Sequence, residues 1–185
     1  MQCFVGPIHR ENPYPEGRVR ITNLTFVDDL ILFRPQEELL NRKDDMDVYL
    51  LGADKTVHWE SDDGDCGIVT VPFGFITDLT SVPWVFRLFV SRAGPWLEAA
   101  VVHDYLYVAW NEVEGARPDP KDRKFADDIM FAAMTTANVG AIRKWAIYAS
   151  VRLFGGWTFG RDDRCNYGDQ TDPRLLYLKD VPKVV

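Results

Sequence analysis

Four residues in two short runs have the types and spacing of a general base and its partners. The run AAVVHDYLY contains His103, Asp104 and Tyr107, and the later run RKFADDIMF contains Asp127. A neutral imidazole can take a proton from water, and a carboxylate on its other ring nitrogen fixes the tautomer and stabilises the imidazolium that forms. We therefore predict a dyad of His103 and Asp127, with Tyr107 beside it.

These side chains need a helix to position them, and the sequence around His103 predicts one from Pro95 to about Trp110. Pro95 suits the first helical position, where its missing N–H costs no hydrogen bond, and Glu98 suits the first turn. At about 100° per residue, His103 lies at the centre of an apolar stripe and Tyr107 lies about 40° from it. The tyrosine therefore lies between the histidine and the adjacent aspartate.

The sequence around Asp127 predicts a second helix, from Pro120 to about Ala137. Asp119 has the side chain of an N-cap, and Pro120 follows it at the first helical position. Asp127 then lies on the edge of an apolar stripe, while Asp128 points about 100° away and is expected to be solvated.

A carboxylate that faces apolar surroundings needs a hydrogen-bonding partner or it loses its charge. His103 and Tyr107 are the candidates for Asp127. Arg123 is an alternative, because it lies one turn earlier on the same face and would form an ion pair that leaves His103 idle. Both readings of Asp127 remain open, and His103 is then either a base or a satisfied core residue.

Composition limits the class of protein. With 185 residues, 46% of them hydrophobic, the chain can bury a full core as one domain. A net charge of −7 disfavours nonspecific binding to nucleic acid, and no run is long and apolar enough for a signal peptide or a transmembrane segment. Cys3, Cys66 and Cys165 are widely spaced and are expected to be free thiols. The absence of HExxH and GxSxG motifs disfavours a zinc hydrolase and a serine triad.

The chain divides into three stretches, and the order of the first two predicts an α+β fold. About 18–80 is strand-rich, 82–157 is helical and 158–185 is an irregular tail expected to wrap the domain or contact a partner. We expect an N-terminal antiparallel β-sheet and a C-terminal region of three to four helices packed on it. Besides the two helices above, short helical patterns lie near Trp84–Val90 and Ala141–Leu153, the latter ending at a Gly-Gly pair. The strand patterns are VRITNLTFVDDLILF, DVYLLG, TVHWES and GIVTVPFGFIT.

Four motifs in order resemble a family found largely in tailed bacteriophages and prophages, known as domain of unknown function 1353. The motifs are GFITDLTSVP, AAVVHDYLY, RKFADDIM and VRLFGGW. The resemblance covers roughly residues 74–157 and implies a phage origin without an established reaction.

The HDxxY helix followed by a helix with an aspartate is also similar to secreted phospholipases of the A-two type, especially the short bacterial and parvoviral forms. That resemblance implies that His103 activates water, that Asp127 with Tyr107 orients it, and that Asp104 holds calcium. Asp78 in TDLTSVP corresponds to an upstream calcium ligand of the bacterial forms, and calcium prefers such oxygen ligands. The glycine-rich calcium loop of those enzymes has no counterpart here, and Asp78 also suits a turn or a helix cap.

Two functions follow from these patterns. The first is a phage-encoded hydrolase, associated with the virion or its tail, that acts on a lipid ester or another cell-envelope bond with help from a divalent cation. The second is a non-catalytic structural or assembly protein of a phage tail or baseplate. The expected partners are other phage structural proteins or a component of the host envelope, and the expected location is the virion tail or the host cytoplasm during assembly.

Overall fold

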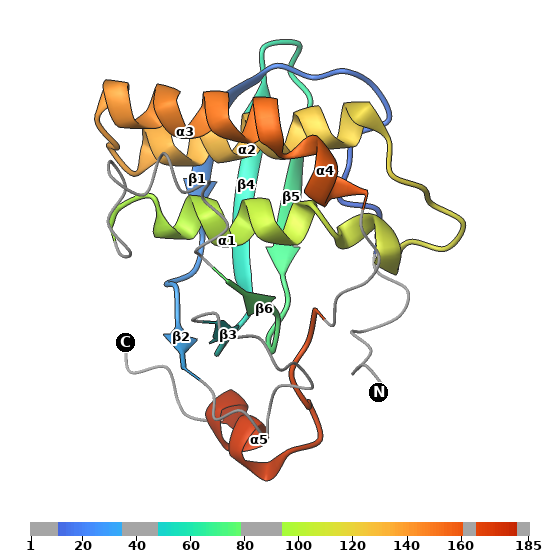
Figure 1. Ribbon diagram of the computed structural model, residues 1–185, viewed down its shortest axis with the longest axis vertical. Coiled ribbons are helices and arrows are strands. Elements are labelled where there is room, and N and C mark those ends of the chain that lie inside the picture. The colour runs from blue at the N-terminus through green and yellow to red at the C-terminus, as the bar shows by residue number, and fades with distance from the viewer. Residues whose placement is uncertain (1–10, 35–47, 79–93, 161–165, 181–185) are drawn as a thin grey trace.

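The predicted α+β architecture is confirmed in a computed structural model of the chain (Figure 1), in which strands precede helices. The predicted helix at 84–90, two of the three cysteines (Cys3 and Cys165) and most of the TDLTSVP run lie outside the described residues. Of the cysteines, Cys66 is described, and it is an exposed free thiol. The structure describes residues 11–34, 48–78, 94–160 and 166–180.

The main sheet is antiparallel and has the strand order β1-β4-β5. Its strands are β1 (Ile21–Phe26), β4 (Lys55–Ser61) and β5 (Cys66–Val71). In the central strand β4, alternate side chains are buried, as expected for a strand with one face on the core. This alternation sets the register in which Val57 pairs with Val69.

A second three-stranded antiparallel sheet corrects the expectation of a single sheet. Its order is β2-β3-β6, with β2 (Leu32–Phe33), β3 (Tyr49–Leu51) and β6 (Ile76–Thr77). Leu50 and Leu51 are both fully buried although they point to opposite faces of β3. Leu51 belongs to the main core and Leu50 to a smaller cluster, so β3 separates two cores.

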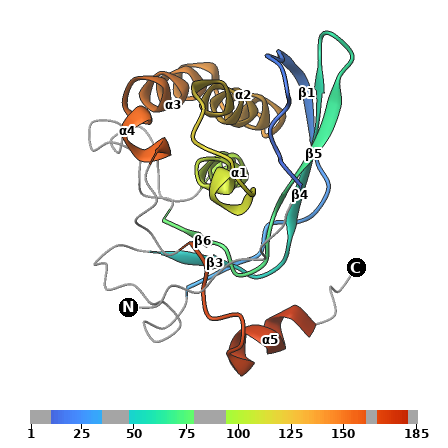
Figure 2. The same ribbon diagram turned by 90° about the vertical axis from the view of Figure 1, so that its right-hand side faces the viewer.

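The helices cover one face of the main sheet, as Figure 2 shows. Helices α1 (Leu97–Leu106) and α2 (Pro120–Thr136) contact each other and the sheet, and α3 (Ala141–Phe154) packs on α2 on the side away from the sheet. A short helix α4 (Gly156–Phe159) follows directly. No helix in the described part of the chain has the length and apolar character to cross a membrane.

The helix boundaries match the sequence prediction closely at α2 and less closely at α1. The Asp119 side chain caps α2 by accepting a hydrogen bond from the backbone N–H of Lys121 at 2.7 Å. Helix α1 is shorter than predicted, because Val108 leaves the helical conformation (φ −123°) and the chain continues as a 3-10 turn, η3 (Ala109–Glu112). The Trp110 indole N–H donates to backbone carbonyls of Tyr107 and Phe159, which ties η3 to α4.

The tail, expected to be irregular, contains helix α5 (Pro173–Asp180). Leu175 on this helix is fully buried, while its neighbour Leu176 is 44% exposed. Leu175 completes the smaller core together with Val48, Leu50, Phe73 and Ile76. Leu175 thus packs α5 against the second sheet, and the segment before α5 is joined to the same region by backbone hydrogen bonds from Ile76 N–H to the Asn166 carbonyl and from Gly168 N–H to the Gly74 carbonyl.

This attachment predicts a large difference between two adjacent leucines. Leu175→Ala should lower the free energy of unfolding by about 2–5 kcal/mol, because it leaves a cavity in the smaller core. Leu176→Ala is the matched control and should change it by less than about 0.5 kcal/mol. Urea unfolding of the two variants measures both values, and equal losses would contradict the anchoring role of Leu175.

Candidate active site

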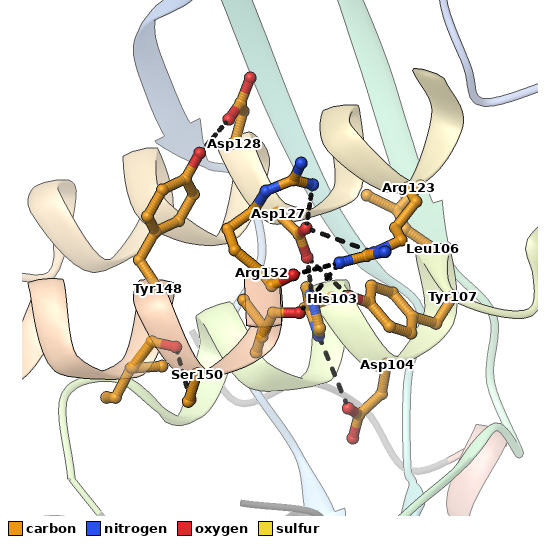
Figure 3. Close-up of polar contacts among 12 residues, drawn as sticks. His103, Asp104, Leu106, Tyr107, Arg123, Asp127, Asp128, Tyr148, Ser150 and Arg152 are labelled. Atoms are coloured by element: carbon orange, nitrogen blue, oxygen red, sulfur yellow. Dashed lines mark hydrogen bonds and ion pairs between the residues drawn. The ribbon is translucent and has the colours of Figure 1, made fainter. Parts of the chain in front are cut away.

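The structure brings His103, Tyr107 and Asp127 together across α1 and α2 (Figure 3). The Asp127 carboxylate is fully buried, and its Oδ1 lies 2.9 Å from His103 Nε2. The Tyr107 hydroxyl donates to the same oxygen at 2.7 Å, and the rings of His103 and Tyr107 lie 4.1 Å apart between centroids. The contact expected between the two helices is therefore present.

The second oxygen of Asp127 is bound by arginine. Arg152 Nη1 on α3 donates to Oδ2 at 2.7 Å, and Arg123 Nε lies 3.9 Å from the same oxygen. Arg123 Nη2 in turn donates to the backbone carbonyl of Arg152 at 2.5 Å. The alternatives considered for Asp127 are thus compatible, because the arginines occupy one oxygen while His103 and Tyr107 share the other.

Sequence reasoning missed Arg152. Its signal was present, because it is a single cation that interrupts the apolar run WAIYASVRLFGGW. Such a cation near the end of an apolar helix needs a partner, and here the partner is a buried carboxylate on another helix.

The hydrogen bonds around Asp127 hold it in the ionised form. Burial alone raises the pKa of this carboxyl, but the donors, first His103 and then Tyr107 and Arg152, outweigh burial and leave the pKa below its ordinary value. Burial raises the pKa of the Tyr107 hydroxyl, and the neighbouring Asp127 charge raises it further. Tyr107 therefore stays a neutral donor to an ionised acceptor.

Because an ionised carboxylate only accepts hydrogen bonds, His103 must donate to Asp127 through Nε2–H. In the neutral ring, the other nitrogen, Nδ1, then carries the lone pair. Asp104 Oδ1 lies 4.0 Å from Nδ1, on the opposite side of the ring from Asp127 (Figure 3). This distance is beyond that of a direct hydrogen bond and lies at the limit of an ion pair with the protonated ring.

His103 is a buried base between two carboxylates, and its side chain is 7% exposed. Burial lowers the pKa of the imidazole, but Asp104 and Asp127 together outweigh burial and leave the pKa above its ordinary value. The Asp104 side chain is 26% exposed, so the Nδ1 side of the ring is the side nearer to solvent.

Asp104, the predicted metal ligand, accepts a hydrogen bond from Thr77 Oγ1 at 2.5 Å. Thr77 precedes Asp78, the second predicted ligand, which is buried. Within the described residues, no group of three or more His, Cys, Asp or Glu side chains could hold a metal ion. A calcium site at Asp104 and Asp78 stays a prediction.

Asp128 differs from its prediction. It was expected to be solvated, but it accepts a hydrogen bond from the Tyr148 hydroxyl at 2.9 Å and pairs with Lys124, and its side chain is only 17% exposed. The adjacent acids Asp127 and Asp128 thus join α2 to its neighbours through different networks.

The Gly-Gly pair after α3 permits the close approach of the helices at Asp127. A Cβ on Gly155 would overlap the Tyr107 hydroxyl and lie 2.5 Å from the Val151 carbonyl oxygen. A Cβ on Gly156 would lie 2.6 Å from Arg123 Nη1. Gly155 is needed because it lacks a side chain. Its backbone conformation would suit other residues, since its φ is an ordinary −67°.

The comparisons with known proteins identify the family. Residues 54–151, more than half of the chain, match the family described as "Protein of unknown function (DUF1353)", and the chain belongs to it. The match includes both site helices and most of α3. No curated protein and no solved structure matches this chain.

The glycine contact predicts an unequal effect of two alanine substitutions. Gly155→Ala should destabilise the protein by about 1–3 kcal/mol, because the new methyl group must displace Tyr107 from Asp127 or shift α4. Gly160→Ala is the control, since no atom of the described residues lies within 4 Å of a Cβ there, and it should be near neutral. Thermal unfolding compares the two, and a Gly155→Ala protein as stable as wild type would refute the close approach.

The raised pKa of His103 predicts a pH-dependent contribution to stability. A group whose pKa is higher in the folded state stabilises most below its unfolded pKa, here near 6.5, and its contribution is lost as pH rises through the folded value. The difference in unfolding free energy between wild type and His103→Asn should therefore be larger at about pH 5.5 than at about pH 9. Urea unfolding across this range measures it, and a difference that grows with pH would contradict the assignment.

Proposed function

We propose that this chain is a hydrolase in which His103 acts as general base on a water molecule and Asp127 orients the imidazole. The substrate class is a lipid ester or another cell-envelope ester. The observation that carries the proposal is the 2.9 Å contact between His103 Nε2 and the fully buried Asp127, which leaves Nδ1 on the side nearer to solvent.

The chemistry follows from the tautomer. Nδ1 of neutral His103 takes a proton from water as the water oxygen bonds to the ester carbonyl carbon. Asp127 stabilises the imidazolium through Nε2–H, and the imidazolium then gives its Nδ1 proton to the leaving alkoxide as the ester C–O bond breaks. The products are a carboxylic acid and an alcohol, and His103 is neutral again.

Tyr107, Arg123 and Arg152 serve this reaction indirectly. Tyr107 and Arg152 donate to the Asp127 carboxylate and keep it ionised, so that it stays an acceptor for Nε2–H, and Arg123 lies within ion-pair distance of the same carboxylate at 3.9 Å. They are positioning residues, because they act on the base through Asp127.

Calcium beside Asp104 and Asp78 is part of the proposal. The ion would polarise the ester carbonyl when bound. Calcium takes about six to eight oxygen ligands, and the described residues do not by themselves supply such a shell. The reaction steps above require only His103, Asp127, water and the ester.

The biological setting is also part of the proposal. The motifs that resemble phage and prophage proteins support a phage-encoded enzyme that is carried on the tail and acts on the host envelope. Family membership itself supplies no reaction, since the family is one of unknown function.

Two neighbouring acids provide a matched test of the dyad. Asp127→Asn should lower ester hydrolysis about 10²–10⁴-fold, as should His103→Asn, because the base loses its orienting partner or is removed. Asp128→Asn should keep near wild-type activity, since Asp128 contacts Lys124 and Tyr148. Initial rates on phospholipid vesicles and a soluble ester, each with calcium and with chelator, measure these effects. Equal rates for wild type and His103→Asn would end the hydrolase proposal.

A second function, a structural component of a phage tail or baseplate, is favoured by one observation. Asp127 is wholly buried and joins α1, α2 and α3, as a purely structural polar cluster would. This function predicts that His103→Asn reduces stability and incorporation into particles while no hydrolysis is lost. Absence of the protein from purified phage particles would exclude this structural function.

A further inference from the structure

The C-terminal arm, which we define as residues 166–180, is paired with the second sheet beside β6. Ile76 N–H donates to the Asn166 carbonyl at 2.8 Å, and Gly168 N–H donates to the Gly74 carbonyl at 2.9 Å. An antiparallel bridge lies between these two hydrogen bonds. Because β3 also pairs with β6, the arm and β3 lie on the two sides of the same short strand.

Tyr167 attaches the arm to the rest of the domain through both its ring and its hydroxyl. Its side chain is buried, and its ring packs edge-on against Phe75 with 5.8 Å between centroids. Phe75 packs in the same way against Tyr105 of α1 at 5.6 Å. The Tyr167 hydroxyl donates to Glu112 Oε1, and the Tyr105 hydroxyl donates to Glu112 Oε2 at 3.3 Å. One carboxylate on η3 therefore joins the arm to α1.

The strand that pairs with the arm also carries a residue that contacts the candidate active site. β6 consists of Ile76 and Thr77, so Thr77 directly follows the residue that binds Asn166. Thr77 is buried, and its Oγ1 donates to Asp104 Oδ2 at 2.5 Å. The other oxygen of Asp104 lies 4.0 Å from His103 Nδ1 (Figure 3). A displacement of β6 would therefore move the Asp104 carboxylate relative to the imidazole.

We propose that Tyr167 is a positioning residue of the candidate active site, because the arm that it attaches keeps Thr77 and Asp104 in place beside His103. The effect on rate rests on the proposed hydrolase function. In that function Nδ1 takes a proton from water, and the negative charge of Asp104 stabilises the imidazolium that forms. The substrate need not touch the arm for this effect, so loosening the arm should lower kcat more than it changes KM.

Two Tyr→Phe substitutions in the same arm test the proposal. Tyr167→Phe keeps the ring but loses the hydroxyl that binds Glu112. The amides of Ile76 and Gly168 should then exchange with solvent about tenfold faster relative to the amides of α2, and kcat should fall about fivefold or more with KM within about twofold. Tyr177→Phe is the matched control, because Tyr177 lies on α5 and is 73% exposed, and it should match wild type. Native-state hydrogen exchange by NMR and initial rates on a soluble ester measure these effects.

Substitutions at Thr77 test the contact between β6 and the site separately. Thr77→Val replaces the hydroxyl that binds Asp104 with a methyl group and leaves the arm intact. It should lower kcat about as much as Tyr167→Phe does, while the two arm amides exchange as in wild type. Thr77→Ser keeps the hydroxyl and should retain most of kcat.

The His103 ring gives a measurement that does not depend on hydrolysis. Its NMR signals report the surroundings of Nδ1, so they should shift in Tyr167→Phe and Thr77→Val and stay in place in Tyr177→Phe. If wild type hydrolyses no ester, the proposed function fails, and the ring signals with the amide exchange still decide whether the arm positions Asp104. Tyr167→Phe with wild-type exchange would overturn the proposal. So would faster exchange that leaves both kcat and the ring signals unchanged.

Discussion

A single buried charge constrains the arrangement of the helices. The Asp127 carboxylate has no exposed surface, and an ion removed from water is tolerated only with partners that replace its hydration. Its partners come from three helices: α1 supplies His103 and Tyr107, α2 supplies Arg123 and α3 supplies Arg152. Each helix is therefore fixed relative to the others by the need to satisfy one carboxylate, in addition to ordinary apolar packing.

The division of the two carboxylate oxygens links this structural role to the proposed chemistry. Arg152 donates to Oδ2, so Oδ1 remains available to His103 Nε2 and the Tyr107 hydroxyl. A carboxylate kept ionised in this way fixes which ring nitrogen carries the proton. The contacts between Asp127 and His103 Nε2, Tyr107 and Arg152 would be the same in a purely structural protein and in an enzyme with a catalytic dyad. They would differ on the Nδ1 side of the ring, where only a dyad needs water and substrate.

The sequence predicted what depends on local periodicity and missed what depends on contacts between distant segments. Asp119 and Pro120 defined the start of α2, and helical spacing brought His103 and Asp127 to facing sides of two helices. Arg152 was missed because its partner lies on another helix, and nothing in its own apolar run indicates that partner. The second sheet was missed for a related reason, since strands of two or three residues carry almost no alternation to reveal their pairing.

The same carboxylate also explains why α3 keeps an apolar face in water. Rotating α3 so that Ile142 and Leu153 turn inward would bury apolar surface, which is favourable in itself. That rotation would pull Arg152 away from Asp127 and leave the buried carboxylate without one of its donors, which would destabilise the protein. Gly155 also restricts how far α3 can move, because its Cα lies so close to the Tyr107 hydroxyl that a Cβ would overlap it. The exposed apolar residues of α3 therefore stay in water because Asp127 holds Arg152, and with it the helix, in this orientation.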